Sequence, residues 1–297
     1  MATPAEKLAV ALAALQTLQQ RGLAAIHTDE LSVQNRVLLT KQGFLREVVR
    51  GWYIPVRPDE RPGDSTSWYA NYWDFCARYL ESRYGDQWLV NADHSLQWHA
   101  GNHAVPAQLM IKAPVATNFN TNLLHHTSLF HLQGSLPPDE QRMDINGIRM
   151  FTLPAALVYC SQSIYTQAET DARTALALIR NAADVLGILL EGGHSTIAGR
   201  LAGAFRNMGR ERIADDITAA MRTAGYEIRE TDPFDTLLAA ELSFRDRSPY
   251  ANRIRLLWQQ MRAQVLRVFP AAPGIAADKA AYLKSIEDAY VMDAYHS

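Results

Sequence analysis

Residues 32–53, SVQNRVLLTKQGFLREVVRGWY, determine how we interpret the rest of the chain. The stretch begins with a serine that can cap a helix, and Gly43 ends the helix that it predicts. After Gly43 the apolar residues no longer follow helical spacing, which predicts two short strands joined by a turn at Arg50-Gly51. A helix followed by a basic hairpin is the second half of a winged helix-turn-helix, so we expect that fold here.

The residues before this stretch complete the arrangement. Thr3 can cap a first helix, with Pro4 at its first position and a stop at Gly22. A second short helix is predicted to begin near Thr28, because acidic residues follow in its first turn. We therefore expect an N-terminal winged-helix domain at residues 1–57.

The third predicted helix has an apolar side and a polar side. Val33, Val37 and Leu38 are expected to face the core, which leaves the polar side chains outward. Residues 32–57 contain five basic side chains and one acid. Lys and Arg neutralise DNA phosphates, while Asn, Gln and Arg can read base edges in the major groove. We predict that an operator DNA contacts Ser32, Gln34, Asn35, Arg36, Thr40, Lys41, Arg46 and Arg50. Two alternatives remain open: a polar face that serves solubility, and a winged helix that binds protein.

A set of residues in the helix and hairpin carries a family resemblance: Leu39, Gly43, Phe44, Leu45, Val48, Arg50, Gly51, Trp52, Tyr53 and Pro55. With these, residues 8–57 resemble the N-terminal winged helix of AbiEi-type antitoxins, which belong to bacterial type IV toxin–antitoxin systems. In that family the helix and the wing bind the operator and repress transcription. The resemblance implies the same role here and a cognate toxin as a possible partner.

A polar linker at residues 57–66 predicts a domain boundary, and the second domain is expected at residues 67–245. Its predicted elements are an aromatic-rich helix, then short strands and helices, then a helical part; the order resembles the C-terminal part of AbiEi-like proteins. The whole chain is therefore predicted to be α+β and helix-rich, with a small mixed α/β middle domain. The predicted helices are 67–84, 169–190, 195–208 and 210–224, with shorter ones near Ser95 and Pro154, and the predicted strands are 88–90, 108–112, 129–132 and 148–151.

The bulk composition limits the possible functions. The 297 residues carry a formal net charge of −2, so any DNA binding must come from a local patch. The two cysteines have neither metal-site nor disulfide-framework spacing, which predicts a reducing cytoplasm. No apolar run approaches the roughly 20 residues that span a bilayer, so we expect no membrane association.

Six of the nine histidines lie between residues 94 and 131. His99 and His103 are four residues apart, but Gly101 and Asn102 interrupt any helix between them. No carboxylate or thiol joins the histidines at a known metal-site spacing. We expect polar surface and one or two buried imidazoles, no metal and no cofactor. No nucleophile–base set is recognisable either, so we expect no enzyme activity in this chain.

The C-terminal segment, residues 246–297, is predicted to hold one helix from about Pro249 to Val268 and another from Asp278 to about Tyr290. It resembles the segment just before the catalytic core of large Fic-family proteins. Ser297 would match the first residue of their inhibitory motif, Ser/Thr-x-x-x-Glu-Gly/Asn. The catalytic signature of that family, His-Pro-Phe-x-x-Gly-Asn-Gly-Arg, is absent from the 297 residues. The resemblance implies an AMP-transferring parent whose catalytic core lies beyond residue 297.

Three functions therefore remain open from the sequence. The first is a DNA-binding antitoxin-like protein or transcriptional autoregulator. The second is a protein-interaction module, or the regulatory half of a Fic AMP-transferase that restrains its catalytic domain. The third is an unrecognised enzyme in the middle domain.

Overall fold

The computed structural model describes residues 3–61, 63–238, 240–245, 248–269, 274 and 278–296, with the backbone alone for 288–296. Met1–Leu256 form one compact unit and Leu257–Ser297 a second. Helices and small sheets together make the chain helix-rich α+β, which confirms the predicted fold class. Ser297, the residue likened to the Fic inhibitory motif, lies outside the described residues.

The N-terminal module, residues 3–57, contains the predicted first and third helices and the predicted hairpin. Its three strands form an antiparallel sheet in the order β1-β3-β2. The predicted second helix is a single 3-10 turn, and the sequence did not predict the two-residue strand β1 before it. The elements are α1 (Pro4–Gln20), β1 (Ile26–His27), η1 (Thr28–Glu30), α2 (Val33–Lys41), β2 (Leu45–Val49) and β3 (Trp52–Pro55).

Both predicted helix caps are present. The Thr3 hydroxyl accepts a hydrogen bond from the Glu6 N–H at 3.2 Å, and the Glu6 carboxylate accepts one from the Thr3 N–H at 2.7 Å. The Ser32 hydroxyl accepts from the Asn35 N–H at 3.2 Å. Such caps satisfy N–H groups that have no partner inside the helix, so they fix where α1 and α2 begin.

The side of α2 that faces the core differs from the prediction. Val33 and Val37 are 65% and 60% exposed, whereas Leu39 is fully buried. Leu38 is partly buried and packs against the same core. The physical reason is the 100° advance per residue, which places Leu39 roughly opposite the two valines. Leu39 fills the space between Leu31 and Leu45, so the valines are left toward solvent.

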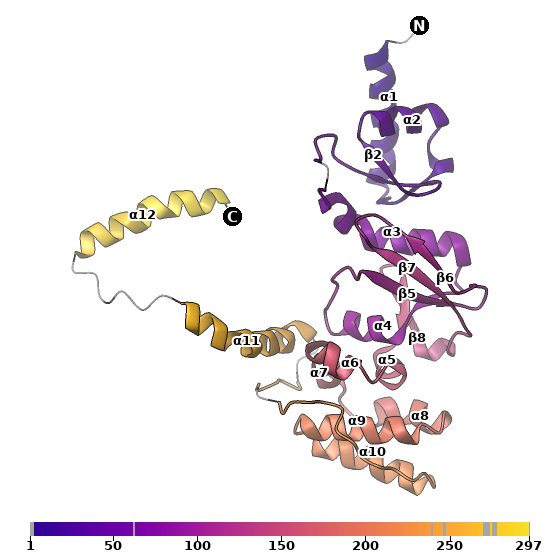
Figure 1. Cartoon of the computed structure of the whole chain (residues 1–297), viewed down its shortest axis with the longest axis vertical. Helices are drawn as coiled ribbons and strands as arrows, with labels where there is room; N and C mark the ends of the chain where they lie inside the picture. The colour runs from indigo at the N-terminus through magenta and orange to yellow at the C-terminus, as the bar shows by residue number, and fades with distance from the viewer. Residues whose placement is uncertain are drawn as a thin grey trace. The chain divides into compact units, whose positions relative to one another are not determined.

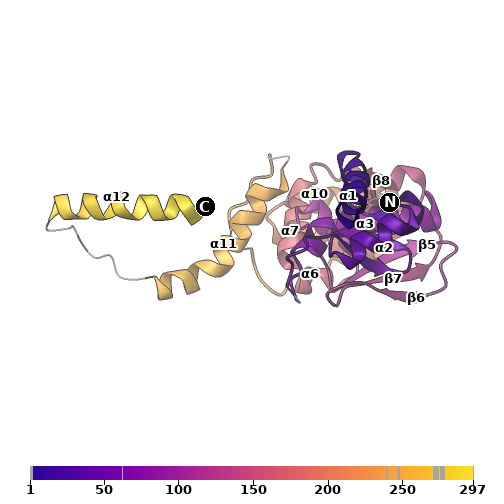
Figure 2. The same cartoon turned by 90° about the horizontal axis from the view of Figure 1, so that it is seen from above.

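The module shares a core with the helix that follows it, α3 (Thr66–Tyr84). Trp52 meets the rings of Phe75 and Tyr79 edge-on, at centroid distances of 6.2 and 5.9 Å. Arg78 of α3 makes an ion pair with Glu30 at 3.0 Å and donates to the Ala25 carbonyl. Figures 1 and 2 show α1 and α2 stacked over α3, which in turn covers the strands of the middle sheet.

The middle sheet has four strands in the order β4-β5-β7-β6, and β5 and β7 pair in parallel. The predicted strands are confirmed, but the sequence missed two more, β6 and β8. On the aromatic-rich helix α3, Phe75 is fully buried, whereas Tyr69 is 44% exposed and lies outside the core. The strands of this sheet are β4 (Leu89–Val90), β5 (Gln108–Ala113), β6 (Phe119–Asn122) and β7 (Ser128–Gln133). The strands β8 (Arg142–Ile145) and β9 (Ile148–Phe151) pair with each other in a separate antiparallel hairpin.

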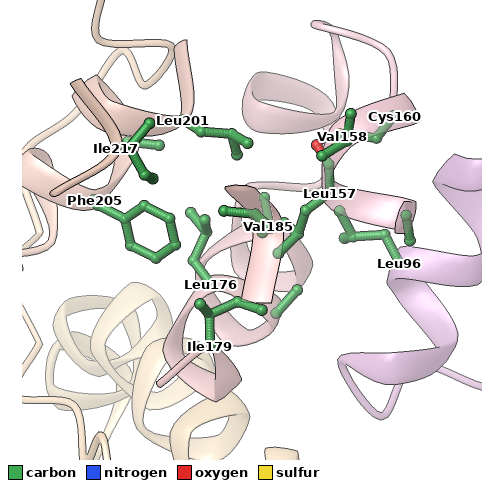
Figure 3. Packing of buried hydrophobic residues seen from close by; sticks show 14 of the residues in the cluster. Leu96, Leu157, Val158, Cys160, Leu176, Ile179, Val185, Leu201, Phe205 and Ile217 are labelled. Atoms are coloured by element: carbon green, nitrogen blue, oxygen red, sulfur yellow. Dashed lines mark hydrogen bonds between the residues drawn. The ribbon is translucent and has the colours of Figure 1, made fainter. Parts of the chain in front are cut away.

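A helical part follows β9 and has one continuous apolar core, shown in Figure 3. Leu157, Leu176 and Phe205 reach this core from three different helices. The predicted helix 169–190 is two helices, because the chain breaks at Ile179. The helices are α4 (Ala92–His99), α5 (Leu153–Tyr159), α6 (Ile164–Gln167), α7 (Glu169–Leu178), α8 (Ala183–Glu191), α9 (Ser195–Asn207) and α10 (Glu211–Thr223), with the 3-10 turn η2 (Asp139–Gln141) before β8.

An extended segment after α10 lies against α9. The Thr231 N–H donates to the Gly199 carbonyl at 3.2 Å. A Cβ atom on Gly199 would overlap the carbonyl of Arg229, and one on Gly203 would overlap that of Thr231. These two glycines, one helical turn apart, let the backbone of the segment approach the helix closely.

The last two helices are α11 (Pro249–Val268) and α12 (Lys279–His296). At the start of α11, Asn252 is buried and its amide bonds both the N–H and the carbonyl of Ser243, at 2.8 and 2.6 Å. Further along, Trp258 and Met261 are 47% and 50% exposed. Large apolar side chains of α11 therefore face solvent.

Candidate nucleic-acid interface

Helix α2 presents an uninterrupted outward face. Gln34, Thr40 and Lys41 are exposed on it, together with Val33 and Val37. Residues 33–41 contain no acidic side chain. A face of this kind, about 14 Å long at 1.5 Å per residue, fits the major groove of duplex DNA.

Three other residues predicted to bind DNA have internal roles. The Ser32 hydroxyl is exposed but caps the helix. The Arg36 guanidinium donates to the Thr28 carbonyl at 2.8 Å and lies 5.8 Å from the centroid of the Tyr53 ring. Asn35 is half-buried. Ser32 therefore fixes the start of α2, and Arg36 holds α2 against η1 and β3. Both residues position the outward face, and their side chains contribute little to its surface.

The β2–β3 hairpin is the wing of the module. Arg50 is exposed at its turn, beside Gly51, whose φ of 82° lies in the left-handed region. The Glu47 carboxylate accepts from the Gly51 N–H at 3.0 Å and so closes the turn. Arg46 is paired with Glu60 at 2.9 Å, and the Glu60 side chain is 4% exposed. Of the two arginines predicted on the wing, Arg50 is placed to reach a phosphate, whereas Arg46 ties the wing to the linker.

Two groups of the module, Tyr53 and Glu30, have shifted pKa values. Burial raises the pKa of the Tyr53 hydroxyl, and the charge of Glu47 adds to the shift. At Glu30 burial opposes ionisation, but hydrogen bonds from Arg78 and from the His27 N–H outweigh it and lower its pKa. Glu30 is therefore ionised and paired at neutral pH, which reduces the repulsion it would exert on an approaching phosphate.

A hollow of 560 Å³ lies between the module, α3 and the β8–β9 hairpin. Its charged side chains include Arg78, paired with Glu30, and Arg149, paired with Glu81. Because both cations have carboxylate partners, the hollow is a weaker site for an anionic ligand than the outward face of α2.

The histidines between residues 94 and 131 do not converge. His99 bonds the Phe151 carbonyl at 2.8 Å, and His94 bonds the Asn91 side chain at 2.7 Å. His131 is fully buried and stacks on Phe119 at a centroid distance of 4.1 Å. In the part of the chain that the structure describes, no three His, Cys, Asp or Glu side chains are placed to hold a metal ion.

His131 links stability to pH. Its ring nitrogens bond the hydroxyls of Tyr84 and Thr121 at 2.9 and 3.0 Å. Burial, with a smaller contribution from the charge of Arg83, lowers the pKa of His131 to about 4. Since the unfolded chain takes up this proton near pH 6.5, the stability that neutral His131 contributes is complete above that pH and is lost progressively toward pH 4.

Glutamine cannot titrate but can still form hydrogen bonds. We therefore expect His131→Gln to reduce the dependence of the free energy of unfolding on pH. Between pH 7.5 and 4 the free energy of unfolding of the wild type should fall by about 2 to 3 kcal/mol more than that of the variant. Urea unfolding at several pH values measures the difference. Parallel pH profiles for the two proteins would contradict the assignment.

No helix in the described ranges is both long and apolar enough to cross a bilayer. No protein-family model matches the sequence, and no curated protein matches it. Among solved structures, the chain is similar to the RV2827C protein from Mycobacterium tuberculosis, with 15% sequence identity and a TM-score of 0.47. The likeness covers 73% of this chain and 80% of that one.

Proposed function

We propose that the chain is a DNA-binding transcriptional regulator of the antitoxin-like, autoregulatory kind, which binds operator DNA through α2 and the wing. The observation that carries the proposal is the exposed face of α2 beside an exposed wing arginine, on a sheet ordered β1-β3-β2. We further propose a cytoplasmic location and a role like that of AbiEi-type antitoxins, with a cognate toxin as partner.

The local charges support this proposal. Lys41 and Arg50 are exposed, while Glu30 and Glu60 are paired with arginines. Two other carboxylates of the module, Asp29 and Glu47, are exposed, but Asp29 contacts the His27 ring nitrogen at 3.1 Å and Glu47 accepts from the Gly51 N–H at 3.0 Å. Phosphate contacts by such side chains provide affinity that is independent of sequence and falls with salt.

We expect the double variant Lys41→Ala/Arg50→Ala to bind duplex DNA at least about tenfold more weakly than the wild type, because alanine cannot neutralise the two phosphates that these cations reach. The slope of log affinity against log salt should also decrease by about two. Fluorescence anisotropy at several salt concentrations measures both quantities, using duplexes selected from a random library with the intact chain.

The matched control is Arg222→Ala, which removes an exposed cation from the last turn of α10. This variant should keep the wild-type affinity and salt slope. Equal decreases in the control and the double variant would show that the effect is one of total charge, and would contradict a site on α2 and the wing.

A second function is favoured by the apolar side chains that α11 leaves exposed. Ile254, Trp258 and Met261 lie on one side of the helix at spacings of four and three residues. Such a stripe suits a protein partner, and we propose as the alternative that it docks a Fic catalytic domain whose activity the chain regulates. Titration calorimetry with a Fic catalytic domain should then show binding that Trp258→Ser weakens; an absence of binding would contradict this alternative.

A further inference from the structure

The two valines on α2 form an exposed apolar strip in the centre of the proposed DNA interface. Val33 and Val37 are one helical turn apart, and Thr40 adds a third β-branched side chain close to the same line. Gln34 and Lys41 lie beside them. Single exposed valines are common on protein surfaces, but here methyl groups form the middle of a face with polar groups at its edge.

Some of the polar side chains that could read bases are turned away from this face. Arg36 is held by the Thr28 carbonyl and the Tyr53 ring, and Asn35 is half-buried. Methyl groups therefore make up a large share of what α2 can present to a base pair. In the major groove the apolar feature of a base pair is the 5-methyl group of thymine.

We propose that α2 recognises the 5-methyl groups of thymines in the major groove through Val33, Val37 and Thr40. This inference rests on the proposed DNA-binding function and specifies its sequence preference. Lys41 and Gln34 lie along one side of the strip, so the same face offers methyl groups and, at that edge, polar groups.

Charge complementarity favours DNA over a protein as the occupant. The helix has no acidic residue, Lys41 is exposed on it, and Arg50 is exposed at the turn of the β2–β3 hairpin. Two valine side chains and one threonine methyl group make a small apolar area, less than the several hundred Å² typical of a protein-docking patch. Packing against a thymine methyl group needs no larger area than this.

The test compares thymine with uracil, which lacks the methyl group and is otherwise the same base. A duplex selected with the intact wild-type chain is resynthesised with deoxyuridine in place of thymidine. We expect the wild type to bind the uracil duplex about fourfold more weakly for each thymine methyl group that is removed from the interface, and so about 15-fold more weakly when two are removed. Val33→Ala/Val37→Ala, which keeps only the Thr40 methyl group of the strip, should lose most of this discrimination.

Val115→Ala is the matched control, because Val115 is 71% exposed in the loop between β5 and β6. This variant should keep the wild-type discrimination. Thermal unfolding of all three proteins checks that the substitutions leave the fold intact, as expected for exposed side chains.

Each possible result is decisive. DNA binding with equal affinity for thymine and uracil overturns the methyl readout and leaves the proposed function standing. An absence of binding to any duplex overturns both. Sedimentation that shows self-association of the wild type and its absence in Val33→Ala/Val37→Ala, with thymine discrimination unchanged, assigns the strip to a protein interface and overturns the inference.

Discussion

Gly203→Ala should lower the free energy of unfolding by about 2 to 3 kcal/mol, although alanine is the better helix former. The reason is steric. A Cβ at this position would overlap the Thr231 carbonyl and approach the backbone of Asp232 at 2.8 Å. To remove this overlap the extended segment has to move away from α9, which breaks the hydrogen bond from the Thr231 N–H to the Gly199 carbonyl. Urea unfolding monitored by circular dichroism measures the change.

Gly187→Ala is the control, and it should change the free energy of unfolding in the opposite direction. Gly187 lies inside α8, and a Cβ there would meet no atom within 4 Å. The substitution should stabilise the chain by about 0.5 to 1 kcal/mol through helix propensity alone. If the two glycine variants changed stability by the same amount and sign, the close approach at Gly203 would be disproved.

Arg173→Met should cost about 3 kcal/mol of stability, because it removes a buried cation that several groups depend on. The guanidinium is paired with Glu169 at 2.8 Å and donates to the Asn207 side chain and the Thr236 carbonyl, both at 2.8 Å. It also lies 3.9 Å from the centroid of the Phe234 ring. Methionine keeps much of the volume but removes the guanidinium donor from all three acceptors. Glu169 still accepts from the Thr236 hydroxyl and the Thr236 carbonyl from the Asn207 side chain, so the loss falls on the Asn207 Oδ1 and on the unpaired Glu169 charge.

Arg212→Met provides the comparison for Arg173. Arg212 is 95% exposed on α10 and reaches Asp216 only at 4.0 Å. Its replacement should change stability by less than about 0.5 kcal/mol. If Arg173→Met lowered the free energy of unfolding by less than about 1 kcal/mol, the interactions of Arg173 would contribute little net stability.

The helices with strong end signals were predictable. Thr3 and Ser32 could be identified as caps because each starts a run of helical spacing, and Gly43 marks where α2 gives way to a strand. The short strands were harder. β1 has two residues, too few for any periodicity, and β6 (Phe119–Asn122) is largely polar.

The break between α7 and α8 depends on interactions that spacing does not reveal. The Asp184 carboxylate accepts from the N–H groups of Arg180 and Asn181 at 3.1 and 3.2 Å, and Arg210 donates to the Ile179 carbonyl. The first interaction is local and could have been suspected from an aspartate in the first turn of a helix. The second comes from 31 residues away, so the sequence alone could not show it.

The candidate site was predictable in its location and less so in its details. The helix and the wing could be identified from 32–53, but which residues face outward depends on the partners that other segments supply. Arg36 is held by Thr28 and Tyr53, and Arg46 by Glu60. Apolar residues spaced along a short helix are compatible with more than one side facing the core, which is why the prediction that Val33 and Val37 face the core is wrong.

Amide hydrogen exchange of the intact chain, with and without a duplex selected from a random library, tests the central claim most directly. We predict that saturating DNA slows exchange in α2 and the wing, residues 33–53, and leaves α8 to α10 unchanged. A chain that binds no duplex would contradict DNA binding through α2 and the wing. Slowed amides that lie elsewhere, for example in β5 and β7, while residues 33–53 exchange as before, would contradict it equally.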